Sequence, residues 1–144
     1  EYIGSFKTKA EAQAELDRIV QEIQAVGVEV GAIDGRTKGE DREVLTQRYL
    51  DRGDPLRVLV VNIQTGALGW DCPAMDVAIF HSNTWSWLDR AQAEERGYRL
   101  GRTRPYMVVD LAITDSIDEM ILDSLQKKQN LIDLLVRGNR ARAV

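Results

Sequence analysis

Apolar residues recur along the chain at two spacings, and these spacings divide it into helices and strands. Leu16, Ile19 and Ile23 are three or four positions apart, which predicts one face of a helix. Thr8 opens a capping-box sequence before this helix, and Gly27 predicts its end. Further helices are predicted at residues 40–50 and 117–136. Short apolar runs predict strands at residues 2–6, 28–33, 57–61, 77–80 and 107–111.

Strands that alternate with helices predict an α/β fold, a central parallel sheet with helices on both faces. The run at 57–61 is almost wholly apolar, as in a strand buried on both faces. The expected buried face of the helix at 40–50 is Val44, Leu45 and Tyr49, and the apolar stripe of the last helix is Ile117, Ile121, Leu125, Leu131 and Leu135. We predict one domain over residues 1–136 and a basic, flexible tail over 137–144.

Composition narrows the functional classes. The chain has 144 residues, a net charge of −4 and 44% hydrophobic residues, which suits one domain with a real core. Nucleic-acid binding would need a local patch, and Arg90, Arg96, Arg99, Arg102 and Arg104 form such a cluster in the sequence. Cys72, the single cysteine, excludes an internal disulfide and is expected to be a small packing residue in a reducing compartment. No apolar run is long enough to span a membrane. Because the chain begins at Glu1, we expect it to be part of a longer protein.

The most informative segment runs from Gln92 to Arg102. Arg96 and Arg99 are three apart, so they fall on one face of a short helix, with Gln92 one turn earlier. Two guanidinium groups in this arrangement suit phosphate oxygens, as in an arginine finger that stabilises a transferring phosphoryl group. The pattern Q-A-x-x-R-x-x-R-x-G resembles motif VI of superfamily-two helicases, and among them the Swi/Snf-type DNA translocases. The resemblance implies catalytic and nucleotide-binding roles for Gln92, Arg96 and Arg99.

Residues 62–76 follow a predicted strand and resemble helicase motif V with its G-x-D-x-P pattern. The loop lies beyond the carboxyl end of that strand, where open α/β sheets bind ligands. Asn62 and Ile63 stand where the family usually carries Ser-Thr. By the resemblance, Gly69 and Asp71 approach the nucleotide ribose. The residues that the resemblance places at the DNA backbone are Gln64, Thr65 and Gly66.

Two further segments extend the resemblance over residues 2–136. Asp34-Gly35-Arg36-Thr37, with Arg42 further on, resembles the G-x-(S/T)…R element of the second helicase lobe. Thr37 and Lys38 could hold a DNA phosphate at a helix N-terminus, although Thr37 could equally be a simple helix cap. Residues 116–122 resemble the segment that follows motif VI in Swi/Snf proteins, which narrows the family.

The chain lacks a phosphate-binding G-x-x-x-x-G-K-[ST] loop and the acidic Mg²⁺ box. The resemblance therefore implies a RecA-like second lobe, whose ATP and Mg²⁺ are held mainly by an N-terminal lobe that the chain does not include. Its expected partners are that lobe and DNA, with no metal site of its own and no membrane. The isolated domain is expected to be monomeric, in the cytoplasm or nucleoid of a prokaryote or phage, or in the nucleus of a eukaryote. Two alternatives stay open: a non-catalytic RecA-like protein-interaction domain, and a flavodoxin-like small-ligand domain that uses Gly66–Gly69.

Overall fold

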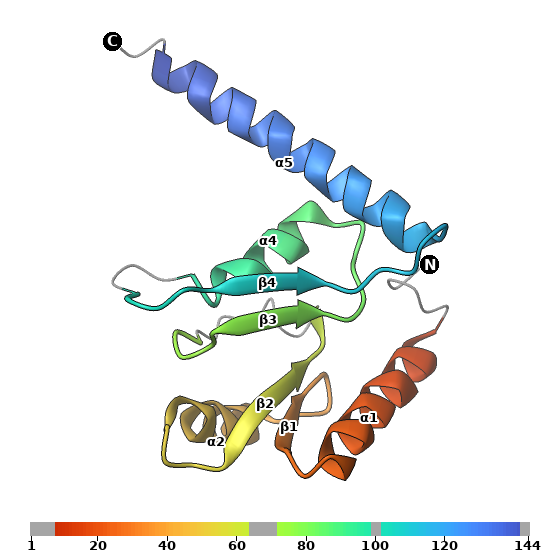
Figure 1. Ribbon diagram of the computed structural model, residues 1–144, viewed down its shortest axis with the longest axis vertical. Helices are drawn as coiled ribbons and strands as arrows, with labels where there is room; N and C mark the ends of the chain where they lie inside the picture. The colour runs from red at the N-terminus through yellow and green to blue at the C-terminus, as the bar shows by residue number, and fades with distance from the viewer. Residues whose placement is uncertain (1–7, 64–71, 99–101, 142–144) are drawn as a thin grey trace.

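The computed structural model describes residues 8–63, 72–98 and 102–141 (Figure 1). Its elements are α1 (Lys9–Ala25), β1 (Glu29–Ile33), α2 (Gly39–Leu50), β2 (Leu56–Val61), β3 (Val77–Phe80), α4 (Trp87–Glu95), β4 (Met107–Asp110) and α5 (Ile117–Ala141). The strand predicted at residues 2–6 lies outside the described residues. Each other predicted strand and helix is present, which confirms the alternating α/β order.

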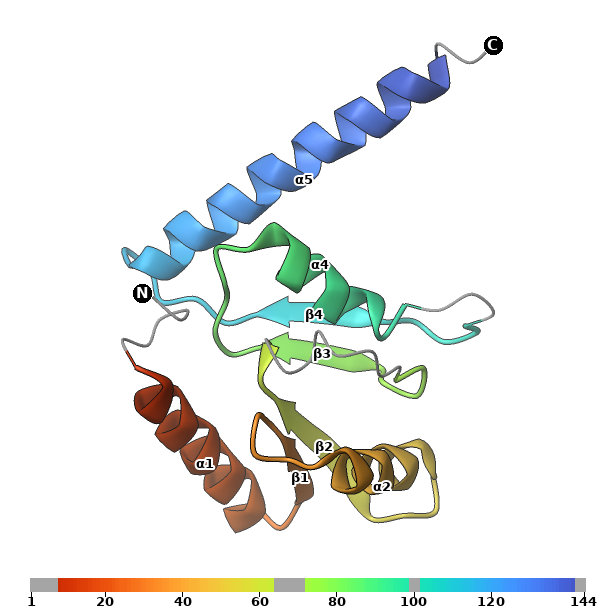
Figure 2. The ribbon, with the colours of Figure 1, turned by 180° about the vertical axis from the view of Figure 1, so that it is seen from behind.

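The described strands form two parallel pairs, β1 with β2 and β3 with β4. The arrows of β2, β3 and β4 point the same way in Figure 1, so their carboxyl ends face one side of the molecule. α2 and α4 lie behind the strands in Figure 1 and in front of them in Figure 2, while α1 packs on β1. This arrangement of parallel strands and flanking helices is RecA-like.

Local sequence explains where α1 begins and ends. The Thr8 hydroxyl accepts the Glu11 N–H at 3.1 Å, and the Glu11 carboxylate accepts the Thr8 N–H at 3.2 Å. This reciprocal pair confirms the predicted capping box. At the other end Gly27 has a φ of +79°, a left-handed conformation that residues with a side chain rarely adopt.

The core lies between α1 and the first strand pair, and between α4 and α5. Leu16, Ile33 and Leu56 are buried in the first part, and Ile121 and Leu125 in the second. Leu56 at the start of β2 is buried, Arg57 is exposed and residues 58–61 are partly exposed, so the burial on both faces expected for residues 57–61 is not found within the described structure.

Two features of the helices differ from the prediction. Val44 is 58% exposed, and no residue of α2 is fully buried. α5 continues to Ala141, past the predicted helix end at Val136 and into the predicted tail. The segment beyond Val136 contains no proline, and one glycine costs a helix only about 1 kcal/mol.

α5 contacts the body of the domain through its first half and then extends away from it (Figure 1). Trp87 donates its indole N–H to Gln129 at 3.0 Å, and Lys128 donates to the Trp85 carbonyl at 2.8 Å. Among the described residues, no helix has the length and apolar character needed to cross a membrane.

Candidate functional site

α4 and the residue after it carry the described part of the arginine motif. The Ser86 side chain caps the helix by accepting a first-turn N–H at 3.3 Å. Gln92 and Arg96 are four residues apart, so they share one side of the helix, and both are partly exposed. The helix ends at Glu95, which makes Arg96 its C-cap. The predicted helix that carries both arginines is therefore too long, and Arg99 lies outside the described residues.

Directly after the end of α4, Gly97 packs closely against side chains from two other segments. A Cβ atom at Gly97 would lie 2.5 Å from the ring of Tyr106 and 2.9 Å from the methyl carbon of Met75. Only glycine lets the chain pass so close to the ring without displacing it. Burial raises the pKa of Tyr106 to about 12, so the phenol stays neutral at physiological pH.

The last part of predicted motif V, residues 72–76, contacts Arg96 through Cys72. The Cys72 N–H donates to the Arg96 carbonyl at 3.2 Å, and the Met75 N–H donates to the Cys72 carbonyl at 3.0 Å. Burial raises the pKa of the Cys72 thiol to about 12, in agreement with its predicted packing role. The predicted nucleotide and DNA contacts outside the described residues are Gln64, Thr65, Gly66, Gly69 and Asp71.

Arg90 anchors α4 to the two strands beneath it. Its guanidinium donates to both carboxylate oxygens of Asp110, to Asn83 and to Glu94, and lies 3.6 Å from the centroid of the Phe80 ring. Burial alone would raise the pKa of Asp110, but hydrogen bonds from Arg90 and Asn83 outweigh it and hold that pKa below its usual value. Sequence reasoning counted Arg90 only as part of a basic cluster. The four-residue spacing to Glu94 was the one signal of a pairing.

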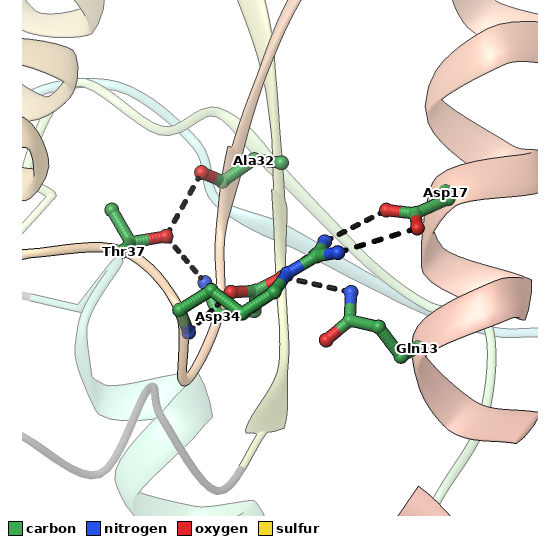
Figure 3. A network of polar contacts seen from close by, with 6 residues as sticks. Gln13, Asp17, Ala32, Asp34 and Thr37 are labelled. Atoms are coloured by element: carbon green, nitrogen blue, oxygen red, sulfur yellow. Dashed lines mark hydrogen bonds and ion pairs between the residues drawn. The ribbon is translucent and has the colours of Figure 1, made fainter. Parts of the chain in front are cut away.

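A buried carboxylate holds the turn between β1 and α2 (Figure 3). Asp34 is only 3% exposed and accepts hydrogen bonds from Gln13 at 2.8 Å and from the Arg36 guanidinium at 2.8 and 3.0 Å. Arg36 also bonds Asp17 on α1 at 2.8 Å. Burial would raise the pKa of Asp34, but its bonds to Arg36 and Gln13 lower it overall. The turn is therefore fixed to α1 before α2 begins.

Thr37 and Lys38, the predicted DNA contacts, lie between this turn and α2. The Thr37 hydroxyl accepts the Asp34 N–H at 3.0 Å and donates to the Ala32 carbonyl at 3.4 Å, so it is committed to the turn (Figure 3). Lys38 occupies the N-cap position and makes no side-chain capping bond. Nearby, the Nε atom of Arg42 is buried and has no hydrogen-bond partner within the described structure. The uncapped N-terminus of α2 favours an anion, to which Lys38 and Arg42 add positive charge, whereas Glu40 and Asp41 in the same turn oppose it.

The two groups of candidate residues lie at opposite ends of the strands. Thr37 and Lys38 follow the carboxyl end of β1, whereas Arg96 bonds to the segment that leads into the amino end of β3. Residues 62–76 start at the carboxyl end of β2 and finish at this amino end. The loop expected to hold a ligand begins beyond the carboxyl end of β2, as predicted, but residues 64–71 lie outside the described residues.

Comparison with known proteins identifies the family. Residues 5–101 match the helicase conserved C-terminal domain. The chain belongs to this helicase family. Its relatives are Swi/Snf-type helicases, as the motifs predicted. Helicase SWR1 of Gibberella zeae is 31% identical over 124 residues, which are 85% of this chain and 7% of that protein. The chromatin-remodeling ATPase INO80 of Vanderwaltozyma polyspora is 31% identical over 106 residues, 74% of this chain and 7% of that protein.

A solved structure agrees with the fold of this helicase domain. The C-terminal part of the Fun30 ATPase domain matches with a TM-score of 0.69 and 23% identity, over 76% of this chain and 35% of that one. ATP-dependent helicase brm of Drosophila melanogaster is 27% identical over 106 residues, 74% of this chain and 6% of that protein. The helicase domain thus spans less than a tenth of the length of these curated relatives.

Proposed function

We propose that this domain is the second motor lobe of an ATP-dependent, Swi/Snf-like DNA translocase. The observation that carries the proposal is the position of Arg96. This residue is the C-cap of α4, one turn after Gln92, and its carbonyl accepts the N–H of Cys72 at the end of motif V. Nucleotide-contacting and DNA-contacting segments that meet at one residue are what a motor needs to link hydrolysis with movement.

In this proposal Arg96 and Arg99 supply positive charge to the γ-phosphate of ATP bound mainly by the first lobe. Gln92 orients the nucleotide from the same side of α4, and Gly69 and Asp71 approach its ribose. Within the described residues no cluster of histidine, cysteine or acidic side chains could hold a metal ion. In the proposal the first lobe holds the Mg²⁺. Loss of an arginine finger costs about 10³–10⁵ in turnover.

The proposed DNA track lies at the carboxyl ends of β1 and β2. Because the Thr37 hydroxyl is occupied by the turn, we assign the phosphate contact there to the first-turn N–H groups of α2, with Lys38 and Arg42 adding charge. Gln64, Thr65 and Gly66 continue the track. Contacts of this kind touch phosphate and sugar, so binding should show weak sequence preference and strong salt dependence. In a eukaryotic host the protein would act in the nucleus.

The test is DNA-stimulated ATP hydrolysis by the parent protein that contains both lobes. We expect stimulation in the wild type and a loss of at least about a thousandfold in kcat for Arg96→Ala and for Arg99→Ala. Arg18→Ala is the matched control, because Arg18 is an exposed arginine whose ion pairs lie on α1, outside the proposed sites. The motor assignment would be rejected if DNA did not stimulate ATP hydrolysis by the wild type. It would also be rejected if Arg96→Ala and Arg99→Ala stayed folded and hydrolysed ATP at the wild-type rate.

One observation favours the alternative of a protein-interaction domain. Leu131, Leu134 and Leu135 on the second half of α5 are 59–68% exposed. If the interaction domain is the whole function, the Arg96 and Arg99 variants would lose stability and leave nucleotide turnover unchanged.

A further inference from the structure

Arg102 uses its whole guanidinium to join separate segments of the chain. Its side chain is only 9% exposed, and its nitrogens make five hydrogen bonds of 2.7 to 3.2 Å. The accepting groups are one carboxylate and four backbone carbonyls, those of Asp76, Pro73, Gly97, Arg104 and Pro105. Arginine has five N–H donors in a rigid planar fork, so every donor is used. Lysine has three donors on one atom and could not reach all five acceptors.

These acceptors lie in three places along the chain. Gly97 is inside the arginine motif directly after Arg96, Pro73 and Asp76 are at the end of motif V, and the other two acceptors follow Arg102. The bond from Arg102 to the Gly97 carbonyl, at 3.0 Å, joins the two ends of the short stretch that contains Arg99. The bond to the Pro73 carbonyl, also 3.0 Å, ties this stretch to the end of motif V.

Side-chain packing also brings Arg102 and Gly97 together, through the Tyr106 ring. The Arg102 guanidinium lies 5.3 Å from the centroid of the Tyr106 ring, and Gly97 packs against that ring. Arg104 also pairs with Asp76, but its side chain is 47% exposed. The two arginines therefore share one acceptor and differ in burial and in the number of segments they join.

We infer that Arg102 is a positioning residue. It holds Gly97, next to Arg96, against residues 72–76 at the end of motif V, and we call this connection the lock. The inference rests on the proposed function for its catalytic consequence, but the lock itself is a property of the domain. Without Arg102 the guanidinium of Arg96 would keep its chemistry, while the backbone at Gly97 directly after it would lose its tie to Pro73. A misplacement of about 1 Å can cost about a hundredfold in rate.

The experiment compares Arg102→Ala and Arg102→Lys in the two-lobe protein with the control Arg18→Ala, which removes an exposed arginine of α1 outside the candidate sites. Amide hydrogen exchange over residues 72–76 and 95–98 reports the lock. The kcat and KM for ATP at saturating DNA report its catalytic effect. We expect faster exchange in both segments and a loss of about a hundredfold in kcat with KM within about twofold for Arg102→Ala. Arg102→Lys should recover little of either, and Arg18→Ala should resemble the wild type in both.

Each outcome decides one statement. Unchanged exchange in Arg102→Ala would overturn the lock. Faster exchange with unchanged kcat in Arg102→Ala would overturn the positioning role and leave Arg102 as a purely structural residue. Full recovery of exchange and kcat in Arg102→Lys would also overturn it, because any cation would then suffice. A wild-type protein without DNA-stimulated hydrolysis would instead overturn the proposed function, while the exchange data would still support or reject the lock.

Discussion

Replacement of Arg90 by methionine should destabilise the domain far more than loss of an exposed ion pair. Methionine keeps much of the apolar stem and removes the guanidinium that bonds Asp110, Asn83 and Glu94. Removing one partner of a buried pair costs about 3–5 kcal/mol, because the other charge stays desolvated. Since Asp110 is 29% exposed and can regain some water, we expect the lower end of that range, about 3 kcal/mol. At this chain length each kcal/mol lowers Tm by about 2–4 °C, so Tm should fall by about 6–12 °C.

Urea unfolding followed by tryptophan fluorescence measures this loss, because Trp85 and Trp87 adjoin the start of α4. Adding Asp110→Asn to Arg90→Met removes the orphaned charge, so the double variant should be more stable than the two separate losses predict, by about 1–3 kcal/mol. The control is Lys127→Ala, whose 73% exposed pair should contribute less than about 0.5 kcal/mol. An Arg90→Met variant as stable as this control, or strictly additive losses, would refute the reasoning.

Three further predictions follow from other contacts. Gly97→Ala should lower the free energy of unfolding by about 1–3 kcal/mol in urea titrations, because the new methyl group would clash with the Tyr106 ring. An unchanged urea midpoint would contradict this prediction and mean that the ring moves aside freely. The pKa values of Asp34 and Asp110 are lower in the folded state than their unfolded value of about 3.9, so the stability they add is present above about pH 4 and is lost as pH falls through their folded values. Urea midpoints from neutral to acid pH should therefore fall less steeply in Asp34→Asn than in the wild type. Lys38→Ala should lower the slope of log affinity for DNA against log salt by about 0.9 if Lys38 neutralises one phosphate, as measured by anisotropy with the two-lobe protein.

The sequence was sufficient for the elements whose signals are local. The Thr8 capping box, the end of α1 at Gly27 and the strand at Val77–Phe80 depend on residues near one another, and the structure has all three. Val44 was misassigned because the spacing of apolar residues shows which side of a helix is apolar, but not how far its partner strand extends.

The candidate site was less predictable because its geometry depends on distant pairs. The residue types at Gln92 and Arg96 were visible as a motif, but the end of α4 at Glu95 is accompanied by packing of Gly97 on Tyr106. The partners of Arg102 lie up to 29 residues away, so no local pattern contains them. A buried arginine and a solvated one look identical in a sequence.

The positions of Thr37 and Arg96 at opposite strand ends have a mechanical consequence. β2 has six residues and spans about 20 Å at about 3.3 Å per residue, and hydrogen-bonded strands resist stretching along their length. Arg96 adjoins the β3–β4 pair and α2 belongs with the β1–β2 pair, so a displacement imposed near Arg96 is not absorbed by stretching of a strand and reaches α2 only if the two pairs move together. The two strand pairs are therefore stiff units, and in the proposed motor the turn of the whole lobe would set the size of each step along DNA.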